Sequence, residues 1–544
     1  MPLLELTLGD LLEKQANDYP NQEAIVYPEH NFRVSYNEFN KIVDQAAKSF
    51  LSLGVEKGDH VAMWSDNKFE WLVTQFATAK IGAVLVTVNT NYQTTELEYL
   101  LKQSNTKVLV MDSKFKNTSY IKVLTDVCPN IVESNKEFIN SVKLPYLDQV
   151  IVLGDEAPSF AYTWNELMEK NEEISDQTLK QAKSNLHWDD VINMQYTSGT
   201  TGFPKGVMLS HHNILNNANQ IGKRMKLSNK DRLCIPVPFF HTFGCVLGIL
   251  TAVTSAATMV IVEQFNAETV LKAVSKEKCT ALHGVPTMFI AELNHPNFKK
   301  YDLSSLRTGI MAGSTCPIEV MQDVMNIMGA DEITICYGLT ETSPVIYQTK
   351  TDDPIELRVS TVGQLHPHIE AKIINPETKE ECAPHEPGEL ITRGYHVMKG
   401  YYNNKKATNE TIDEDGWLWT GDLATKDENG YVKINGRNKD MIIRGGENIY
   451  PREIEEFLYS HQAILDVQVV GVPDKKYGEE IMAWIILKEG IKVTDTDIRD
   501  YCLNQISYHK IPKYVEFIYE YPMTASGKIQ KYKLQEMGKK LIES

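Results

Sequence analysis

Cysteine pairs, the usual sign of a zinc site or a disulfide framework, are missing from this chain of 544 residues. Its eight cysteines, among them Cys128, Cys234, Cys279 and Cys502, are scattered and form no CxxC motif. The first residues, MPLLELTLGDLLEKQ, lack the basic segment, apolar stretch and small-residue cleavage site of a secretory signal. We therefore expect a cytoplasmic protein with reduced thiols.

An excess of basic charge is missing as well. The formal net charge is −17 at pH 7, whereas a surface that follows a nucleic acid needs clustered Lys and Arg. We therefore expect no nucleic-acid partner. A pocket inside an acidic protein can still bind an anion through local cations, and Lys205, Arg437 and Lys528 are candidates.

One stretch, residues 233–262, contains no Asp, Glu, Lys or Arg, as a membrane span would. It is interrupted, however, by Pro236, Pro238, His241, Gly244 and Gly248. The pattern predicts instead a buried strand over 233–237, a helix after Gly244 and a strand over 258–262. We expect no transmembrane segment, while peripheral membrane contact and the oligomeric state stay open.

Apolar runs that alternate with helical patterns predict a layered α/β domain. The expected strands are 107–111, 150–153, 192–196, 280–283 and 332–335, and the expected helices include 69–81 and 268–275. Between residues 359 and 432, short strands with turn signals predict a small β-barrel or a distorted antiparallel sheet. The chain is too long for one core, so at least two domains are expected.

A smaller unit begins after Gly436. A helix over 452–461, strands over 467–472 and 481–487, a helix over 495–504 and a closing strand predict an α+β domain. The predicted domains are therefore 1–436 and 437–544, with a hinge near 437–440.

The segment TSGTTGFPKG, residues 197–206, has the composition of a phosphate-binding loop. Glycines allow backbone N–H groups to approach phosphate oxygens, hydroxyls add donors and one lysine adds charge. A Walker loop is excluded because the lysine is followed by Gly206 and not by Ser or Thr. A solvated turn is the alternative. The candidate residues are Thr197, Ser198, Gly199, Thr200, Thr201, Gly202, Phe203, Pro204 and Lys205.

Four further segments resemble motifs of the adenylate-forming superfamily of acyl-CoA synthetases, luciferases and peptide-synthetase adenylation domains. They are YGLTETSP (337–344), WTGD (419–422), GRNKD (436–440) and PMTASGK (522–528). Their order and spacing fit, and the resemblance covers essentially the whole chain. MIIRGGENIYPREIEEF and ISYHKIPKYVEF are most similar to medium- and long-chain fatty acyl-CoA ligases.

This resemblance implies a ligase that uses ATP, Mg²⁺ and CoA and converts a fatty acid first into acyl-AMP and then into acyl-CoA. Glu341 would hold Mg²⁺, Thr340 would contact the α-phosphate, and the 197–205 loop would hold the β- and γ-phosphates. Lys528, on a mobile small domain, would bridge the acid and the nucleotide. Without the other motifs, Lys528 is more simply a solvated lysine in an SGK turn.

The remaining site residues follow from the same resemblance. Gly313, Ser314, Tyr337 and Gly338 resemble an adenine pocket, although a strand end with a core aromatic explains them equally well. Asp422 would bind the ribose hydroxyls and Arg437 the ribose or phosphate. Lys439 would be the hinge, and Gly445 and Gly446 would line the pantetheine channel. His241 would gate the acyl channel or be a core histidine.

Alternatives remain for the function. FFHTFG (239–244) contains no acid to pair a substrate ammonium, so an amino-acid substrate is disfavoured. An aryl acid, transfer to a carrier protein, or a nucleotide-binding regulator without turnover remain the rival interpretations.

Overall fold

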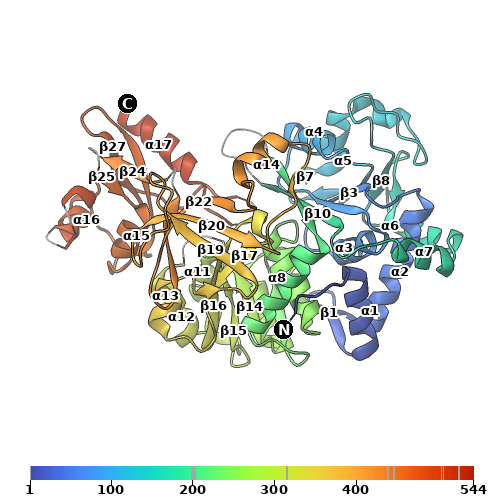
Figure 1. Ribbon diagram of the computed structural model, residues 1–544, viewed down its shortest axis with the longest axis horizontal. Helices are drawn as coiled ribbons and strands as arrows, with labels where there is room; N and C mark the ends of the chain where they lie inside the picture. Colours follow the sequence, from blue (N-terminus) through green and yellow to red (C-terminus); the bar gives the residue numbers. More distant parts are fainter. Residues whose placement is uncertain are drawn as a thin grey trace.

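The computed structural model describes residues 2–197, 204–313, 316–437, 440–444, 447–503, 505–506, 508–524 and 527–543. The first part of the chain forms an elongated α/β body. The C-terminal part forms a small unit at one end of this body, with the elements labelled β24, β25, β27 and α15–α17 in Figure 1. The predicted class, a large layered α/β part followed by a smaller α+β part, is confirmed.

The first large sheet has eight strands, with parallel pairing from β10 through β9 and antiparallel pairing at the β21 edge. Its strands are short apolar runs such as VLVT and VLVM, which suit a sheet buried on both faces. In sheet order they are β21 (Gly400–Tyr401), β11 (Lys205–Ser210), β10 (Val191–Thr197), β4 (Val84–Thr87), β3 (His60–Trp64), β5 (Val108–Met111), β8 (Gln149–Val152) and β9 (Tyr162–Thr163).

The second large sheet has nine strands and a parallel centre from β16 to β1. In sheet order they are β18 (Gln364–Leu365), β17 (Val345–Gln348), β16 (Glu332–Gly338), β15 (Thr308–Met311), β14 (Ala281–Gly284), β12 (Arg232–Ile235), β13 (Thr258–Ile261), β1 (Glu23–Tyr27) and β2 (Phe32–Ser35). The five strands predicted from apolar runs are all present, shifted by one residue or extended at their ends.

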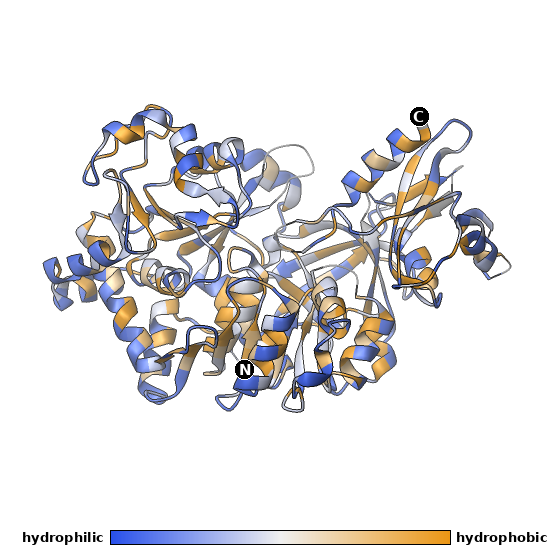
Figure 2. Ribbon diagram, turned by 180° about the vertical axis from the view of Figure 1, so that it is seen from behind, coloured by the Kyte–Doolittle hydropathy of each residue, from blue (hydrophilic) through white to orange (hydrophobic). Residues whose placement is uncertain are grey.

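Helices form a layer between the two sheets. One apolar core contains residues of both sheets together with α2, α3 and α8, and every residue of α3 from Trp71 to Ile81 is buried, as expected for a helix that is apolar all round. The helices are α1 (Leu8–Asp18), α2 (Tyr36–Ser52), α3 (Phe69–Ile81), α4 (Thr94–Gln103), α5 (Tyr120–Val127), α6 (Trp164–Glu169), α7 (Asp176–Ser184), α8 (His211–Arg224), α9 (Thr251–Thr254), α10 (Ala267–Glu277), α11 (Pro286–Leu293), α12 (Ile318–Asn326), α13 (Ile355–Ser360) and α14 (Lys405–Thr411). Figure 2 shows the hydrophobic residues concentrated on the strands and hydrophilic residues on the outer helices.

The uncharged stretch 233–262 forms β12, a helical segment and β13, as predicted. The helical segment begins at Phe243 and not after Gly244, and Phe243–Leu250 is a π-helix. A Cβ on Gly244 would lie 2.2 Å from the Pro238 carbonyl oxygen, so only glycine lets this first turn pack against the preceding backbone. Within the described residues, none of the helices is long and apolar enough to cross a membrane.

Residues 369–437 form an antiparallel sheet in the order β19 (Ile369–Ile374), β20 (Gly388–Gly394), β22 (Leu418–Lys426) and β23 (Val432–Arg437). The described strand pairing does not join β23 back to β19. Of the two predicted alternatives, the structure therefore has the antiparallel sheet and not the β-barrel. Strand β21, which lies between β20 and β22 in sequence, is not part of this sheet and pairs with β11 of the eight-stranded sheet.

The C-terminal unit has its own apolar clusters. It contains β24 (Ile442–Arg444), β25 (Glu447–Ile449), α15 (Pro451–Tyr459), β26 (Ile464–Asp474), β27 (Gly478–Leu487), α16 (Asp495–Cys502), β28 (Tyr514–Phe517) and α17 (Lys531–Glu543). The predicted strands and helices of this unit are present, whereas α17 was not predicted. The boundary at 436/437 stays a prediction, and the separate clusters support it.

Candidate active site

The predicted site residues gather at the carboxyl edges of the parallel strands. β10 ends at Thr197, β15 ends two residues before Gly313, and β16 ends at Gly338, directly before the 3-10 turn Thr340–Thr342. Ligands of open α/β sheets bind at this edge. Segments that are distant in sequence therefore reach one region.

The two ends of the predicted phosphate loop lie side by side. Thr197 and Lys205 are opposite each other in the antiparallel register of β10 and β11, and the Pro204 carbonyl accepts a 3.0 Å hydrogen bond from the Tyr99 hydroxyl. Ser198, Gly199, Thr200, Thr201, Gly202 and Phe203 lie outside the described residues. The residues on either side of the predicted loop are therefore held together by the pairing of β10 with β11.

Glu341 and Lys205 meet through a residue that the sequence analysis did not identify. The Tyr401 hydroxyl donates a 2.8 Å hydrogen bond to Glu341 Oε1, and Lys205 Nζ lies 4.6 Å from the centroid of the same ring. Glu341 and Thr340 are both half-buried. The GY pair between β20 and β22 was the only sequence signal for Tyr401, and its strand pairing with β11 cannot be predicted from that pair.

The predicted nucleotide residues Tyr337 and Asp422 are in direct contact. The Tyr337 hydroxyl donates to Asp422 Oδ2 at 2.5 Å across 85 residues of sequence, while the Tyr337 ring stays half-buried. Asp422 is also opposite position 437 in the register of β22 and β23. The structure thus brings together three positions predicted for the base and ribose, whereas Ser314 lies outside the described residues.

Two glycines border the site, one required by a close approach and the other favoured by its backbone conformation. At Gly338, a Cβ would lie 1.7 Å from the Pro344 carbonyl oxygen, so the chain before Glu341 turns where no side chain fits. Gly313 has φ +93°, and its Cβ would lie 3.5 Å from Lys528 Cε. Gly313 therefore borders the lysine from the C-terminal unit.

Lys528 reaches this edge of the large part. Its Nζ lies 3.3 Å from His241 Nε2, and the preceding Gly527 carbonyl accepts a hydrogen bond from Thr287 Oγ1 at 3.5 Å. Within the turn, the Lys528 N–H donates to Thr524 Oγ1 at 3.0 Å. The small unit is thus positioned with Lys528 at the carboxyl edge of the parallel strands of the large part.

His241 is held in one orientation. Its Nδ1 accepts the Phe243 N–H at 3.1 Å, so the proton of the neutral ring lies on Nε2. Burial and the nearby Lys528 ammonium lower the pKa of His241 well below its ordinary value. With the proton on Nε2, the His241 N–H and the Lys528 ammonium are two donors 3.3 Å apart and form no hydrogen bond with each other, so a carboxylate oxygen that accepts from both would stabilise the pair.

The structure describes little of the remaining residues to which the resemblance assigns a role. Lys439, Gly445 and Gly446 lie outside the described residues, and of Arg437 only the backbone is described. Next to the glycine pair, Arg444 makes a buried ion pair with Glu480 at 2.7 Å and lies over the Tyr477 ring at 4.4 Å. Lys476 lies over the same ring at 4.6 Å. This group of cations borders the segment that the resemblance assigns to CoA.

The donor set fits a magnesium ion held mainly by substrate. No group of three or more His, Cys, Asp or Glu suited to a metal occurs in the described part of the chain. Mg²⁺ is commonly bound by one or two carboxylates together with the phosphates of a nucleotide. Glu341, beside the loop ends at Thr197 and Lys205, offers such a carboxylate.

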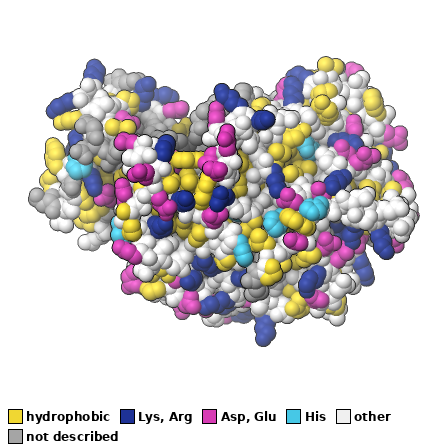
Figure 3. Space-filling view, in the orientation of Figure 1, with side chains coloured by type: hydrophobic (Ala, Val, Ile, Leu, Met, Phe, Trp, Pro, Cys, Tyr) yellow, Lys and Arg dark blue, Asp and Glu magenta, His cyan; other side chains and the backbone are white. Residues whose placement is uncertain are grey.

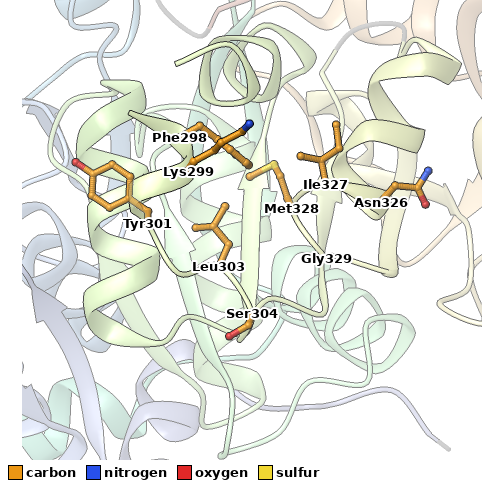
Figure 4. A pocket seen from close by; sticks show the side chains of 9 residues that line it. All are labelled: Phe298, Lys299, Tyr301, Leu303, Ser304, Asn326, Ile327, Met328 and Gly329. Atoms are coloured by element: carbon orange, nitrogen blue, oxygen red, sulfur yellow. The ribbon is translucent and has the colours of Figure 1, made fainter. Parts of the chain in front are cut away.

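A surface cavity of about 280 Å³ lies at the opposite edge of the nine-stranded sheet. It is bordered by residues before β15 and between α12 and β16, at the amino ends of these strands (Figure 4). The lining residues are Phe298, Lys299, Tyr301, Leu303, Ser304, Asn326, Ile327, Met328 and Gly329. This cavity is therefore separate from the candidate active site.

Figure 3 shows acidic and basic side chains interspersed over one face of the molecule, without a continuous basic area.

Comparison with known proteins decides the family. Residues 12–402 match the model of AMP-binding enzymes, and residues 453–528 match that of the AMP-binding enzyme C-terminal domain. The chain belongs to the AMP-binding enzyme family. YngI of Bacillus subtilis, which carries an acyl-CoA synthetase name, is 56% identical over 98% of this chain and 97% of its own. The mitochondrial medium-chain acyl-CoA ligase ACSF2 of Bos taurus is 42% identical over 97% and 87%.

Solved structures agree in fold. The anthranilate CoA ligase AuaEII in complex with anthranoyl-AMP superposes with a TM-score of 0.89 at 26% identity, covering 100% of this chain and 99% of its own. ATP-bound MatB from Rhodopseudomonas palustris has a TM-score of 0.85 at 26% identity, with 99% and 100% covered. The protein is accordingly an AMP-forming acid–CoA ligase that acts through an acyl adenylate and uses ATP and CoA.

Proposed function

We propose that the acid is a medium- or long-chain fatty acid. The observation that supports this is the uncharged, buried surrounding of the Lys528 and His241 pair. From His241 the chain continues directly into the apolar π-helix Phe243–Leu250, all of whose residues are buried, and residues 233–262 contain no charged side chain. An alkyl chain gains free energy from such surroundings, whereas a charged substituent loses it.

In the proposed adenylation step, His241 and Lys528 orient the carboxylate toward the α-phosphorus of ATP. The carboxylate oxygen forms the new P–O bond and pyrophosphate leaves with the electrons of the broken P–O bond. Lys205, the loop residues and Thr340 stabilise the phosphate charge. Mg²⁺, held by Glu341 and the phosphates, supplies further charge neutralisation when bound.

Tyr337, Asp422 and Arg437 are the proposed contacts of the adenosine. For the second step we propose that the small domain turns about Lys439, which withdraws Lys528 and presents the Gly445 and Gly446 face to the CoA thiol. The thiol sulfur then attacks the acyl carbon and AMP leaves. Residues 1–436 and 437–544 are the two proposed domains that move relative to each other.

AMP release in the presence of ATP, Mg²⁺ and CoA tests the substrate class. Short, medium and long saturated acids should be compared with aryl acids such as anthranilate, since structural relatives include ligases of aryl acids. The proposal expects kcat/KM to rise with chain length up to the medium or long acids. It is overturned if an aryl acid is preferred, or if a carrier protein replaces CoA as the acceptor.

A further inference from the structure

Tyr401 contacts two charged residues of the proposed mechanism, Glu341 and Lys205. Its hydroxyl donates to Glu341 Oε1 at 2.8 Å, and its ring faces Lys205 Nζ at 4.6 Å from the centroid. Among the ion pairs of the described residues, none joins Lys205 to Glu341. One aromatic side chain thus contacts an anion through its edge and a cation through its face.

The position of this ring is fixed by three elements. Tyr401 is opposite Val207 in the register of β21 and β11, and its N–H donates to Thr408 Oγ1 of α14 at 2.9 Å. On the other side, the Met398 N–H donates to the Glu341 carbonyl at 2.9 Å. The tyrosine is 6% exposed, so its hydroxyl points to Glu341 from a rigid frame.

We propose that Tyr401 is a positioning residue that keeps Glu341 available for the metal ion and Lys205 available for the phosphates. The hydrogen bond orients the carboxylate through Oε1 and leaves its second oxygen to face the metal. The ring holds the ammonium by its π-face without neutralising it, because a cation–π contact leaves the full charge on the lysine.

The electrostatics of the pair agree with this role. A tyrosine phenol is neutral at pH 7, so the Tyr401 hydroxyl remains a donor to the Glu341 carboxylate. Donation to a carboxylate also polarises the phenol toward its ring, which strengthens attraction of the lysine. If the ring were absent, the Lys205 ammonium over its face and the Glu341 carboxylate at its hydroxyl would be free to form an ion pair and withdraw each other from substrate.

This inference rests on the proposed role of Glu341 as the metal ligand. The variants are Tyr401→Phe, which removes only the hydroxyl, and Tyr401→Leu, which also removes the ring. Tyr402→Phe is the matched control: its hydroxyl accepts from Asn105 Nδ2 at 3.2 Å and lies outside the site. ATP binding to each purified protein, without acid or CoA, is measured by calorimetry with Mg²⁺ and with EDTA.

For Tyr401→Phe we expect the gain in ATP affinity caused by Mg²⁺ to fall about tenfold, as for loss of a hydrogen bond to a charged group, with affinity in EDTA unchanged. Tyr401→Leu should also lose affinity in EDTA, and Tyr402→Phe should match the wild type. The inference is overturned if Mg²⁺ raises the ATP affinity of Tyr401→Phe as much as that of the wild type.

A double-mutant cycle with Glu341→Gln separates positioning from a fold effect. Tyr401→Phe should not change the Mg²⁺ gain further once Glu341 is replaced, whereas a purely structural role would lower the melting temperature and ATP affinity equally in both backgrounds. If Glu341→Gln itself keeps the full Mg²⁺ gain, the proposed metal ligand is wrong. If it loses the gain and Tyr401→Phe does not, only the inference about Tyr401 fails.

Discussion

At the scale of single residues, the contact between Lys528 and His241 is the most informative. The two nitrogens are 3.3 Å apart although 287 positions separate them in the sequence. Motif spacing predicted that Lys528 matters, because the SGK turn resembles a family motif. It did not predict which residue Lys528 meets, since that depends on how two separately folded units face each other.

The predicted roles of Lys528 separate the two half-reactions. Lys528→Ala should lower acyl-AMP formation on the order of a hundredfold, because a cation next to the reacting phosphate is lost. Thioester formation from supplied acyl-AMP should stay nearly intact. Stopped assays of each half-reaction measure both rates. Replacement of a nearby exposed lysine, Lys533→Ala, is the control. If Lys528→Ala slows both half-reactions equally, the proposed role of Lys528 is contradicted.

Other site residues were invisible in the sequence. Tyr401 follows a glycine in a short strand, and nothing in KGYYN indicates that the first tyrosine contacts Glu341 while the second contacts Asn105. The contact of Tyr337 with Asp422 likewise arises from the packing of β16 against the antiparallel sheet. Sequence motifs predicted the members of the site, and tertiary structure determines their pairing.

At the scale of elements, buried parallel strands were predictable and the special helices were not. Apolar runs of four or five residues predicted β5, β8, β10, β14 and β16, because such runs suit a sheet covered on both faces. The π-helix Phe243–Leu250 has the same composition as an α-helix, so periodicity alone cannot identify its wider turn.

Helix α17 was not predicted, and Gly538 lies inside it, where glycine has a low helix propensity. The structure explains the glycine: a Cβ at this position would lie 2.5 Å from Met482 Sδ and 2.9 Å from Val472 Cγ1. Close packing of α17 on β26 and β27 therefore outweighs the low helix propensity of glycine, and only the tertiary contact shows this.

The end of strand β16 offers a test of backbone packing. Gly338→Ala would place a Cβ 1.7 Å from the Pro344 carbonyl oxygen, which forces the turn before Glu341 to move. We expect destabilisation of about 1–3 kcal/mol together with a loss of adenylation. Chemical unfolding and ATP-dependent acyl-AMP formation measure the two effects. Wild-type stability with unchanged activity would show that the turn relaxes without cost.

At the scale of the whole molecule, few described contacts join the small unit to the large part. They include Lys433 with Glu456 at 3.2 Å, Arg452 with the Ile434 carbonyl at 2.9 Å, and the Lys528 contact. A joint with few contacts is the expected place for both domain motion and proteolysis.

Limited trypsin digestion of the ligand-free protein should therefore cut first between residues 437 and 444 and release a C-terminal piece of about a hundred residues. Mass spectrometry of the first fragments identifies the cut. ATP with a fatty acid should slow the cleavage by holding the units closed. A first cut within residues 205–313 would place the boundary elsewhere.

Buried ionisable groups predict how the whole molecule responds to acid. Burial lowers the pKa of His211 and His396 to about 3 and that of His283 to about 4. These rings bind protons near pH 6.5 only when unfolded, so each one destabilises the fold as pH falls from 6.5 toward 4. Two buried acids act in the opposite direction: burial raises the pKa of Asp66 and Asp466 to about 6, so they bind protons first when folded.

Further buried groups shift in the same two directions: burial lowers the pKa of His241 and His366 and raises that of Glu292 and Glu70. Because the histidines with lowered pKa outnumber the acids with raised pKa, unfolding at pH 5 should take up protons, and stability should fall as the pH falls through this range. Calorimetric unfolding at pH 7, 6 and 5 at constant salt measures the slope, and buffers of different ionisation enthalpy measure the proton uptake. His396→Gln should remove about one proton of uptake, whereas the exposed His30→Gln should not. A melting temperature that stays constant or rises between pH 6.5 and 5 would mean that the buried acids outweigh the histidines. Unchanged proton uptake in His396→Gln would contradict the lowered pKa of that ring.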